Sequence, residues 1–155
     1  MEKLLDVLEW VRKQDWPTDP LLGPTTTNIG IIEGGVAANV FAPSARAEVL
    51  MRAVSAVEPT IAAIAARCAE CGVTADFTAS NDPVFYDPPE DVESYVVSFN
   101  TDATYLTELA PVWLVGPGDI EVAHGVDEHI TIASLDQGID LYEKLGRSVL
   151  ENAPD

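Results

Sequence analysis

Basic residues are scarce in this sequence: eight Lys and Arg stand against 26 Asp and Glu, for a formal net charge of −18. Contacts to phosphate depend on clustered Lys and Arg, so this balance argues against binding to nucleic acid or to an anionic membrane. The sequence has no apolar run of the roughly 18 residues that a membrane span needs. Its first residues also lack the basic region and apolar core of a signal peptide. We therefore expect a cytoplasmic protein.

Cysteine is scarce too, and two cysteines are too few for a domain held together by disulfides. Cys68 and Cys71 form a Cys-x-x-Cys pair, which can be redox-active or supply half of a zinc site. The sequence has no second pair, and this one lies at the carboxyl end of a predicted helix, where the helix dipole disfavours thiolates. The preferred interpretation is that both are structural or incidental thiols.

The sequence as a whole has 155 residues and 47% apolar content, which is enough for one folded core. In the first half of the sequence, the spacing of apolar residues predicts helices at residues 2–14 and 58–71. The second of these helices ends at Gly72. It also predicts strands at residues 25–32, 45–54 and 73–79, with a break at Gly34-Gly35. This order predicts a small α+β layer with no strand before its first helix.

A turn-rich acidic segment at residues 81–91 is typical of a linker, so we expect a boundary between a domain at 1–80 and one at 81–155. The second part predicts βα units in an α/β arrangement, without enough strands for a complete sheet. Its predicted elements are a strand at 95–99, a helix capped by Thr101-Asp102 that carries Tyr105, Leu106 and Leu109, a strand at 111–115 and an extended piece at 129–132. A final helix has a capping box at Ser134 and Gln137 and an apolar face of Leu135, Ile139, Tyr142, Leu145 and Val149.

The apolar run at residues 111–115 leads into a glycine loop that contains His124, one of only two histidines. Loops at the carboxyl ends of buried strands are where α/β folds place their chemistry, so His124 is a candidate metal ligand or else a surface histidine. Glu128 is a candidate partner that would orient its imidazole. His129 is expected to be an exposed strand residue. Glu128 and three nearby acidic residues can also form no more than a solvated acidic rim of the loop. The three residues are Asp119, Glu121 and Asp127.

Two blocks of this sequence resemble one family of metallohydrolases. The lid-domain signature of that family is similar to the strand ending in Arg52 and the run before it, Gly34-Gly35-Val36-Ala37-Ala38-Asn39-Val40-Phe41-Ala42-Pro43. Its carboxy-terminal catalytic segment is similar to Asn100-Thr101-Asp102, Gly116-Pro117-Gly118 and Ala123-His124-Gly125-Val126-Asp127-Glu128. The family includes acetylornithine deacetylase, succinyl-diaminopimelate desuccinylase, aminoacylase and glutamate carboxypeptidase. The likeness covers nearly the whole chain but only the later part of the family, so the chain resembles a carboxy-terminal fragment.

The resemblance implies a hydrolase with two zinc ions, which polarise an amide carbonyl and activate water while a glutamate takes the proton. His124 matches the last histidine ligand of the family. Asn39 and Arg52 match lid residues that reach the substrate, commonly in the neighbouring subunit's site, and Gly116 and Gly118 match the loop that lines the pocket. Residues 100–102 match a segment close to that pocket. The resemblance also implies a homodimer formed through the lid.

Two expected motifs of the family do not occur in this sequence: a His-x-Asp and an adjacent Glu-Glu pair. A catalytic zinc needs about three protein ligands, so we expect this chain to be inactive by itself and identify no catalytic residue in it. One hypothesis is that the chain is part of a two-zinc amidohydrolase. The other is a non-catalytic binding or dimerisation module derived from the lid of such an enzyme.

The substrate is left open by the sequence. Arg52 suits a substrate carboxylate, which fits an N-acyl amino acid or a dipeptide, but does not choose among acetyl, succinyl and aminoacyl groups. A deacylase of amino-acid metabolism is the first choice and a peptidase the second. Asn39 can also be a simple turn residue, and Arg52 a solvated strand residue.

Overall fold

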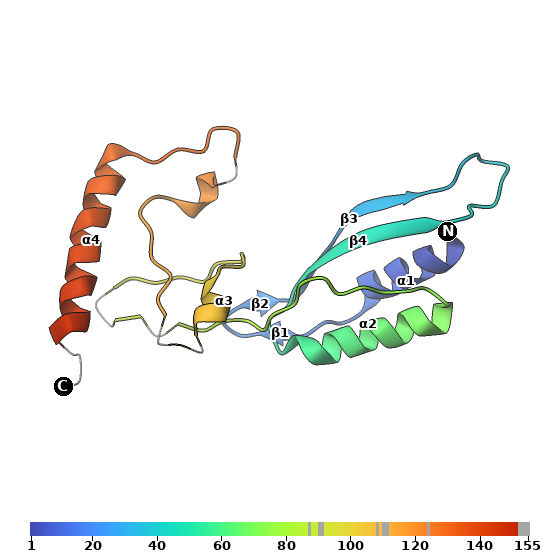
Figure 1. Ribbon diagram of the computed structural model, residues 1–155, viewed down its shortest axis with the longest axis horizontal. Coiled ribbons are helices and arrows are strands. Elements are labelled where there is room, and N and C mark those ends of the chain that lie inside the picture. Colours follow the sequence, from blue (N-terminus) through green and yellow to red (C-terminus); the bar gives the residue numbers. More distant parts are fainter. Residues whose placement is uncertain (87, 90–91, 108, 110–111, 124, 152–155) are drawn as a thin grey trace. The chain divides into compact units, whose positions relative to one another are not determined.

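The computed structural model describes residues 1–86, 88–89, 92–107, 109, 112–123 and 125–151 (Figure 1). The chain divides into two compact units, residues 1–112 and residues 113–155. Helices and small antiparallel sheets occur together, which confirms the predicted α/β class. Contact-based units and domains do not have to coincide, so the boundary between residues 80 and 81 stays a prediction.

The first unit begins with α1 (Glu2–Lys13), as the helical spacing of apolar residues predicts. Its buried face consists of Val7, Leu8 and Val11. The Trp16 indole N–H donates to the Val11 carbonyl oxygen at 2.9 Å and so ties the chain after the helix back to it. A short antiparallel pair follows, β1 (Thr18–Asp19) with β2 (Gly23–Pro24).

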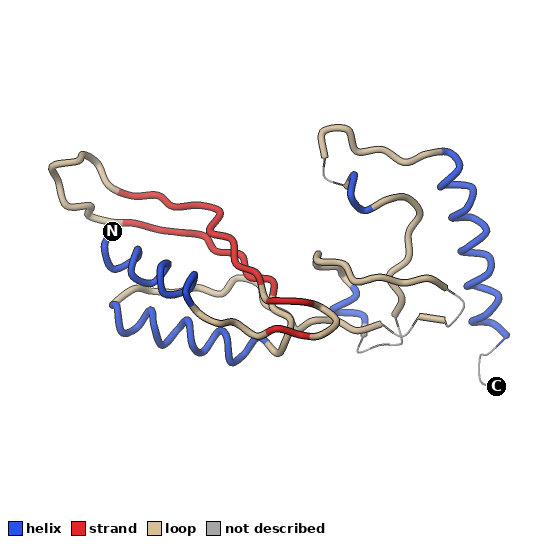
Figure 2. Tube along the Cα trace, turned by 180° about the vertical axis from the view of Figure 1, so that it is seen from behind, coloured by secondary structure: helices blue, strands red, loops and turns tan. Residues whose placement is uncertain are grey.

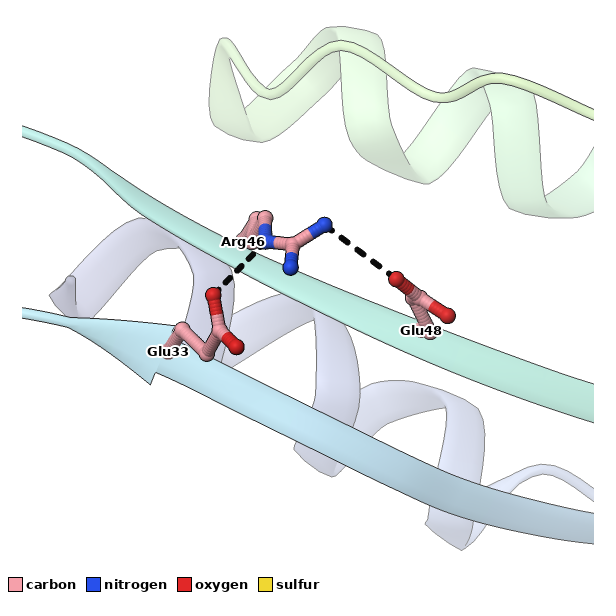
Figure 3. A network of polar contacts seen from close by, with 3 residues as sticks. All are labelled: Glu33, Arg46 and Glu48. Atoms are coloured by element: carbon pink, nitrogen blue, oxygen red, sulfur yellow. Dashed lines mark hydrogen bonds and ion pairs between the residues drawn. The ribbon is translucent and has the colours of Figure 1, made fainter.

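An antiparallel hairpin forms the main sheet of this unit: β3 (Thr26–Gly34) pairs with β4 (Ala45–Arg52). The first strand is predicted by its β-forming residues and the second by its alternating side chains, and both strands are confirmed. The turn depends on Gly34, because a Cβ there would lie 2.8 Å from the Ser44 carbonyl oxygen, at a φ of +152°. On the exposed face, Arg46 donates to Glu33 at 2.8 Å and to Glu48 at 3.2 Å (Figure 3).

The second helix, α2 (Val57–Cys71), lies beside α1 (Figure 2). It ends as predicted at Gly72, whose φ of +63° is left-handed and whose N–H bonds the Cys68 and Ala69 carbonyls. The two helices share one apolar cluster, built on Val7, Val11 and Cys68 and completed by Trp10, Trp16, Ile64, Cys71, Val73 and Ala75.

Three predicted strands are wrong. Within the described residues, the segments 73–79, 95–99 and 112–115 belong to no β-ladder. An apolar or alternating run becomes a strand only when another backbone pairs with it, and the described part of the chain supplies none for these three. The helix expected after Thr101-Asp102 forms as α3 (Ala103–Leu106), and Leu109 lies beyond its end.

The second unit contains a 3-10 turn, η1 (Ile120–Val122), and the long helix α4 (Ile132–Glu151). The predicted capping box at Ser134 and Gln137 is wrong, as is the extended piece at 129–132. Thr131 is the capping residue, because its hydroxyl accepts the Ser134 N–H at 3.0 Å. Ser134 and Gln137 therefore lie inside the helix.

The predicted apolar face of α4 is buried only at Leu145. Its other members are exposed: Leu135, Ile139, Tyr142 and Val149. Within the second unit, Pro117 packs on this helix at Gly138.

Candidate functional site

Asn39 lies in the loop that joins β3 and β4. The Val40 N–H donates to the Ala37 carbonyl oxygen at 3.1 Å, so Asn39 occupies a position inside a tight turn. Its side chain is exposed, and so are its apolar neighbours Val36 and Phe41, the latter 99% accessible. The loop therefore presents an amide beside an uncovered aromatic ring.

Arg52 is the last residue of β4 and pairs in register with Thr26, at the opposite end of the hairpin from the Asn39 loop. The eight residues of β4 separate the two ends by about 23 Å, at roughly 3.3 Å per residue. An arginine side chain spans about a third of that length. A single copy of the chain therefore does not bring Asn39 and Arg52 onto one small substrate.

The two arginines of β4 differ in their partners. Arg46 hydrogen-bonds the Glu33 carboxylate, which lowers the pKa of Glu33 and raises that of Arg46. The Arg52 side chain makes no hydrogen bond or ion pair with any other residue that the structure describes. The guanidinium of Arg52 is thus available to a carboxylate from outside.

Residues 100–102 form a polar network within the first unit. The Asn100 amide donates to Asn81 at 3.1 Å, and its carbonyl oxygen accepts from the Thr101 N–H at 3.0 Å and from the Thr104 hydroxyl at 3.2 Å. The Thr101 hydroxyl contacts the Tyr86 hydroxyl at 3.3 Å. These contacts stabilise the turn before α3, which is a structural role.

The glycine loop of the second unit is held by α4. Gly138, buried in this helix, lies so close to Pro117 that an added Cβ would be 2.9 Å from the Pro117 Cβ. The Tyr142 hydroxyl donates to the Val115 carbonyl oxygen at 3.1 Å. Gly116 and Gly118 flank Pro117 and are exposed, with Gly118 at a φ of +99°.

Sequence reasoning missed Gly138 and gave Tyr142 only a place in the apolar face. A glycine inside a helix costs stability and so usually has a packing reason, which is the signal that was available for Gly138. The hydrogen bond from Tyr142 had no such signal, because its acceptor is a backbone carbonyl 27 residues earlier.

The predicted metal ligand, His124, lies outside the described residues. Nearby, Asp119 accepts the Glu121 N–H at 2.9 Å and so caps η1. His129 is exposed, as predicted, and its Nδ1 lies 2.7 Å from the Asp127 carbonyl oxygen. Among the residues that the structure describes, no three or more of His, Cys, Asp and Glu are grouped so as to hold a metal ion. The described residues therefore do not fit a zinc site by themselves.

Cys68 and Cys71 are free thiols, the first buried and the second half-buried. Burial, and secondarily the neighbouring Cys71, raises the pKa of the Cys68 thiol. A raised pKa keeps the thiol protonated and unreactive, which agrees with the structural interpretation.

No helix in the described part of the chain is long and apolar enough to cross a membrane.

Residues 1–76, which include the helix pair and the hairpin of the first unit, match the peptidase dimerisation domain of the M20 family. The chain belongs to the M20 peptidase family.

Curated relatives extend this likeness through most of the chain. A peptidase M20 domain-containing protein of Schizosaccharomyces pombe is 37% identical over 135 residues, which cover 84% of this chain and 33% of that protein. A probable carboxypeptidase of Aspergillus clavatus is 36% identical over 154 residues, 87% of this chain and 33% of that protein. One of Aspergillus terreus is 36% identical over 151 residues, with coverages of 83% and 34%. The chain thus spans about a third of the length of these relatives. No solved structure matches it.

Proposed function

We propose that this chain is the lid and carboxy-terminal part of a metal-dependent amidohydrolase that removes the acyl group from an N-acyl amino acid or cleaves a dipeptide-like amide. The observation that carries the proposal is Arg52, whose side chain has no partner among the described residues and which lies at the base of a hairpin in a dimerisation domain. A guanidinium without a protein partner suits the carboxylate of an amino acid or peptide. A deacylase is the first choice and a peptidase, as the relatives' names suggest, the second.

The separation of Asn39 and Arg52 supports a homodimer as the working form. Because the eight residues of β4 alone set the two ends of the hairpin about 23 Å apart, we propose that one substrate meets both side chains only when two copies contribute, Arg52 from one and Asn39 from its partner. The dimerisation-domain match of residues 1–76 supports the same assembly.

The metal ions of the proposed enzyme are zinc, as in the family that the sequence resembles, and they would supply an activated water. His124 is the proposed ligand from this chain, and the remaining ligands are assigned to polypeptide outside it. Gly116 and Gly118 are proposed to line the pocket, since both are exposed and offer backbone without a side chain. Residues 1–80 and 81–155 are proposed as the lid and catalytic portions, in a cytoplasmic enzyme.

The test is substrate binding by Arg52→Ala in the complete enzyme. Hydrogen bonds to charged groups contribute about 1.5–3 kcal/mol, so we expect KM to rise about 10- to 100-fold for substrates with a free carboxylate. For carboxamide analogues of these substrates, we expect wild type and Arg52→Ala to have the same KM. Arg12→Ala is the matched control, since it removes a charge from α1 in the same domain. Equal KM values for wild type and Arg52→Ala would refute the role of Arg52.

A non-catalytic binding or dimerisation module is the alternative function. It is favoured by the lack of a group of three metal ligands in the described part of the chain. Reading the coding DNA in frame upstream of the Met1 codon separates the two. A His-x-Asp and a Glu-Glu pair there support the hydrolase, whereas a start codon with no such segment nearby supports the module.

A further inference from the structure

The net charge of this chain is concentrated in its second half. Residues 1–67 contain six Lys and Arg and eight Asp and Glu, for a net charge of −2. Residues 68–155, which we call the acidic half, contain two Lys and Arg and 18 Asp and Glu, for a net charge of −16. Like charges that share one compact region repel one another, and this self-repulsion destabilises the folded state. At low salt we therefore expect the acidic half to be the less stable part of the chain.

The helices of residues 1–71 have two kinds of support against such repulsion. Acidic groups there are paired with basic ones: Lys13 forms an ion pair with Glu9 on α1, and Arg46 forms one with Glu33 on the hairpin. Helices α1 and α2 also bury a shared apolar cluster, and the burial of apolar side chains does not depend on charge. The stability of α1 and α2 is therefore expected to depend little on the salt concentration.

Helix α4 has less of both kinds of support. Among its 20 residues only Gly138 and Leu145 are buried. Asp136 and Asp140 are exposed and lie at positions i and i+4, where two like charges destabilise a helix. Neither carboxylate forms an ion pair with any other residue that the structure describes. The helix also has no acidic residue in its first turn and no basic residue in its last turn, so charged side chains there do not compensate its dipole.

Acidic residues are also frequent in the segment that leads into α4. Residues 113–143 contain seven Asp and Glu and no Lys or Arg. Four of the seven precede the helix and are exposed: Asp119, Glu121, Asp127 and Glu128. Within α4, Arg147 lies 2.7 Å from Glu143, but both side chains are exposed, and exposed ion pairs contribute little to stability. The acidic residues of 113–143 therefore repel one another with no basic residue among them.

The contacts that hold the glycine loop at residues 116–118 depend on α4 being helical. Gly138 lies against Pro117, and the Tyr142 hydroxyl donates to the Val115 carbonyl oxygen at 3.1 Å. Gly138 and Tyr142 are four residues apart, so they share one face of α4 only while this part of the chain is a helix. Opening of α4 would therefore break both contacts and release the loop.

We infer that α4 and the glycine loop that it holds form a salt-dependent switch. At low ionic strength, repulsion within the acidic half opens α4 and releases the loop. Concentrated monovalent salt restores both, while α1 and α2 stay folded throughout. The Debye length falls from about 30 Å at 0.01 M salt to about 3 Å at 1 M, which is less than the rise of one helical turn, so the higher concentration screens even Asp136 from Asp140. The switch concerns one helix and its loop and does not depend on the proposed hydrolase activity.

The test is hydrogen exchange of the full chain at one pH in about 0.02 M and about 2 M KCl. In the higher salt we expect the amides of residues 132–151 to exchange more slowly by about tenfold or more, and those of α1 and α2 to change by less than about threefold. The amide NMR signals of Gly116 and Gly118 should shift with the same salt midpoint as the protection of α4. Equal slowing in all three helices, separate midpoints for α4 and the loop, or an α4 that stays unprotected at every salt concentration would overturn the inference.

Two double variants test whether the charge of the acidic half is the cause. Asp136→Asn with Asp140→Asn removes two charges from α4, and Asp6→Asn with Asp15→Asn removes two from exposed positions in residues 1–67. At low salt the first double variant should slow exchange in α4 by about twofold or more, because it removes a like-charge pair. The second should leave α4 unchanged. Equal exchange of α4 in the two double variants would contradict the role of the acidic half.

An uncharged solute separates screening from a general stabilisation, and it is applied to the unsubstituted chain, so it is decisive even where an Asn variant does not fold. Sucrose is excluded from protein surfaces and so stabilises folded states without screening charges. At about 1 M, sucrose should slow exchange in α1, α2 and α4 by similar factors. Slowing confined to α4 would overturn the inference, because the same selectivity would then arise without ions.

Discussion

Replacing Gly138 by alanine tests how α4 holds the glycine loop. Gly146 is the matched control, because both glycines lie inside the same helix but no atom comes within 4 Å of a Cβ added at Gly146. In a helix interior, Gly→Ala stabilises by about 1 kcal/mol. The Gly146→Ala substitution should therefore raise the free energy of unfolding by about this amount.

At Gly138 the same gain is opposed by a collision. The new Cβ would lie 2.9 Å from the Cβ and 3.1 Å from the Cγ of Pro117, both shorter than ordinary contact. Overpacking of this kind costs about 1–3 kcal/mol, so Gly138→Ala should be less stable than Gly146→Ala by about that amount. Because Pro117 lies between the two predicted pocket glycines, the shift would also displace their backbone.

The assay is urea unfolding of the full chain, combined with hydrogen exchange of residues 132–151, which isolates α4 from the helices of the first unit. In the proposed hydrolase, Gly138→Ala should raise KM while Gly146→Ala leaves it unchanged. Equal stabilisation by both substitutions would refute the argument that Pro117 packs on Gly138.

Three other predictions concern stability. Thr131→Ala should destabilise α4 by about 1 kcal/mol, measured by exchange in residues 132–151, because the mutation removes the hydroxyl that caps the helix; no change would contradict that cap. The pKa of Glu33 is held below its ordinary value of 4.5 by Arg46, so the stabilisation from this pair is present at neutral pH and lost as the pH falls through the lowered pKa. Glu33→Gln should flatten that part of the stability–pH curve, slightly since the pair is exposed, and an unchanged curve would exclude the pair as its cause. Finally, no Lys or Arg occurs between Arg67 and Lys144, a stretch that holds more than half of the 26 acidic residues. Raising KCl to about 1 M should therefore raise the unfolding midpoint by screening self-repulsion, and a midpoint insensitive to salt would contradict this.

Local patterns account for the elements that were predicted correctly. The helical spacing that predicts α1 and the β-formers that predict β3 act within one segment. Gly72 ends α2 because a left-handed residue is needed there, again a local requirement. The helix start at Thr131 was missed because Ser134 and Gln137 offered a second, equally local capping pattern.

For the candidate site, the sequence predicts which residues are candidates but not how far apart they lie. Asn39, Arg52, Gly116 and Gly118 were identified from their resemblance to known motifs, and the structure places each on an exposed loop or strand end. The separation of Asn39 from Arg52 was not predictable, because it is set by the length of the hairpin. The contact between Gly138 and Pro117 joins segments about twenty residues apart and has no local signature beyond the helical glycine itself.

The sequence by itself determined the helices and the glycine turns of this protein, because helical periodicity and backbone handedness depend on near neighbours in the chain. Only the tertiary structure decided which extended runs become strands and which residues can share a substrate. Residues 73–79 and 112–115 have strand-like composition, yet a ladder needs a second backbone, and in the described chain none pairs with them. Asn39 and Arg52 have suitable side chains, but the rigid length of β4 holds them at opposite ends of one copy.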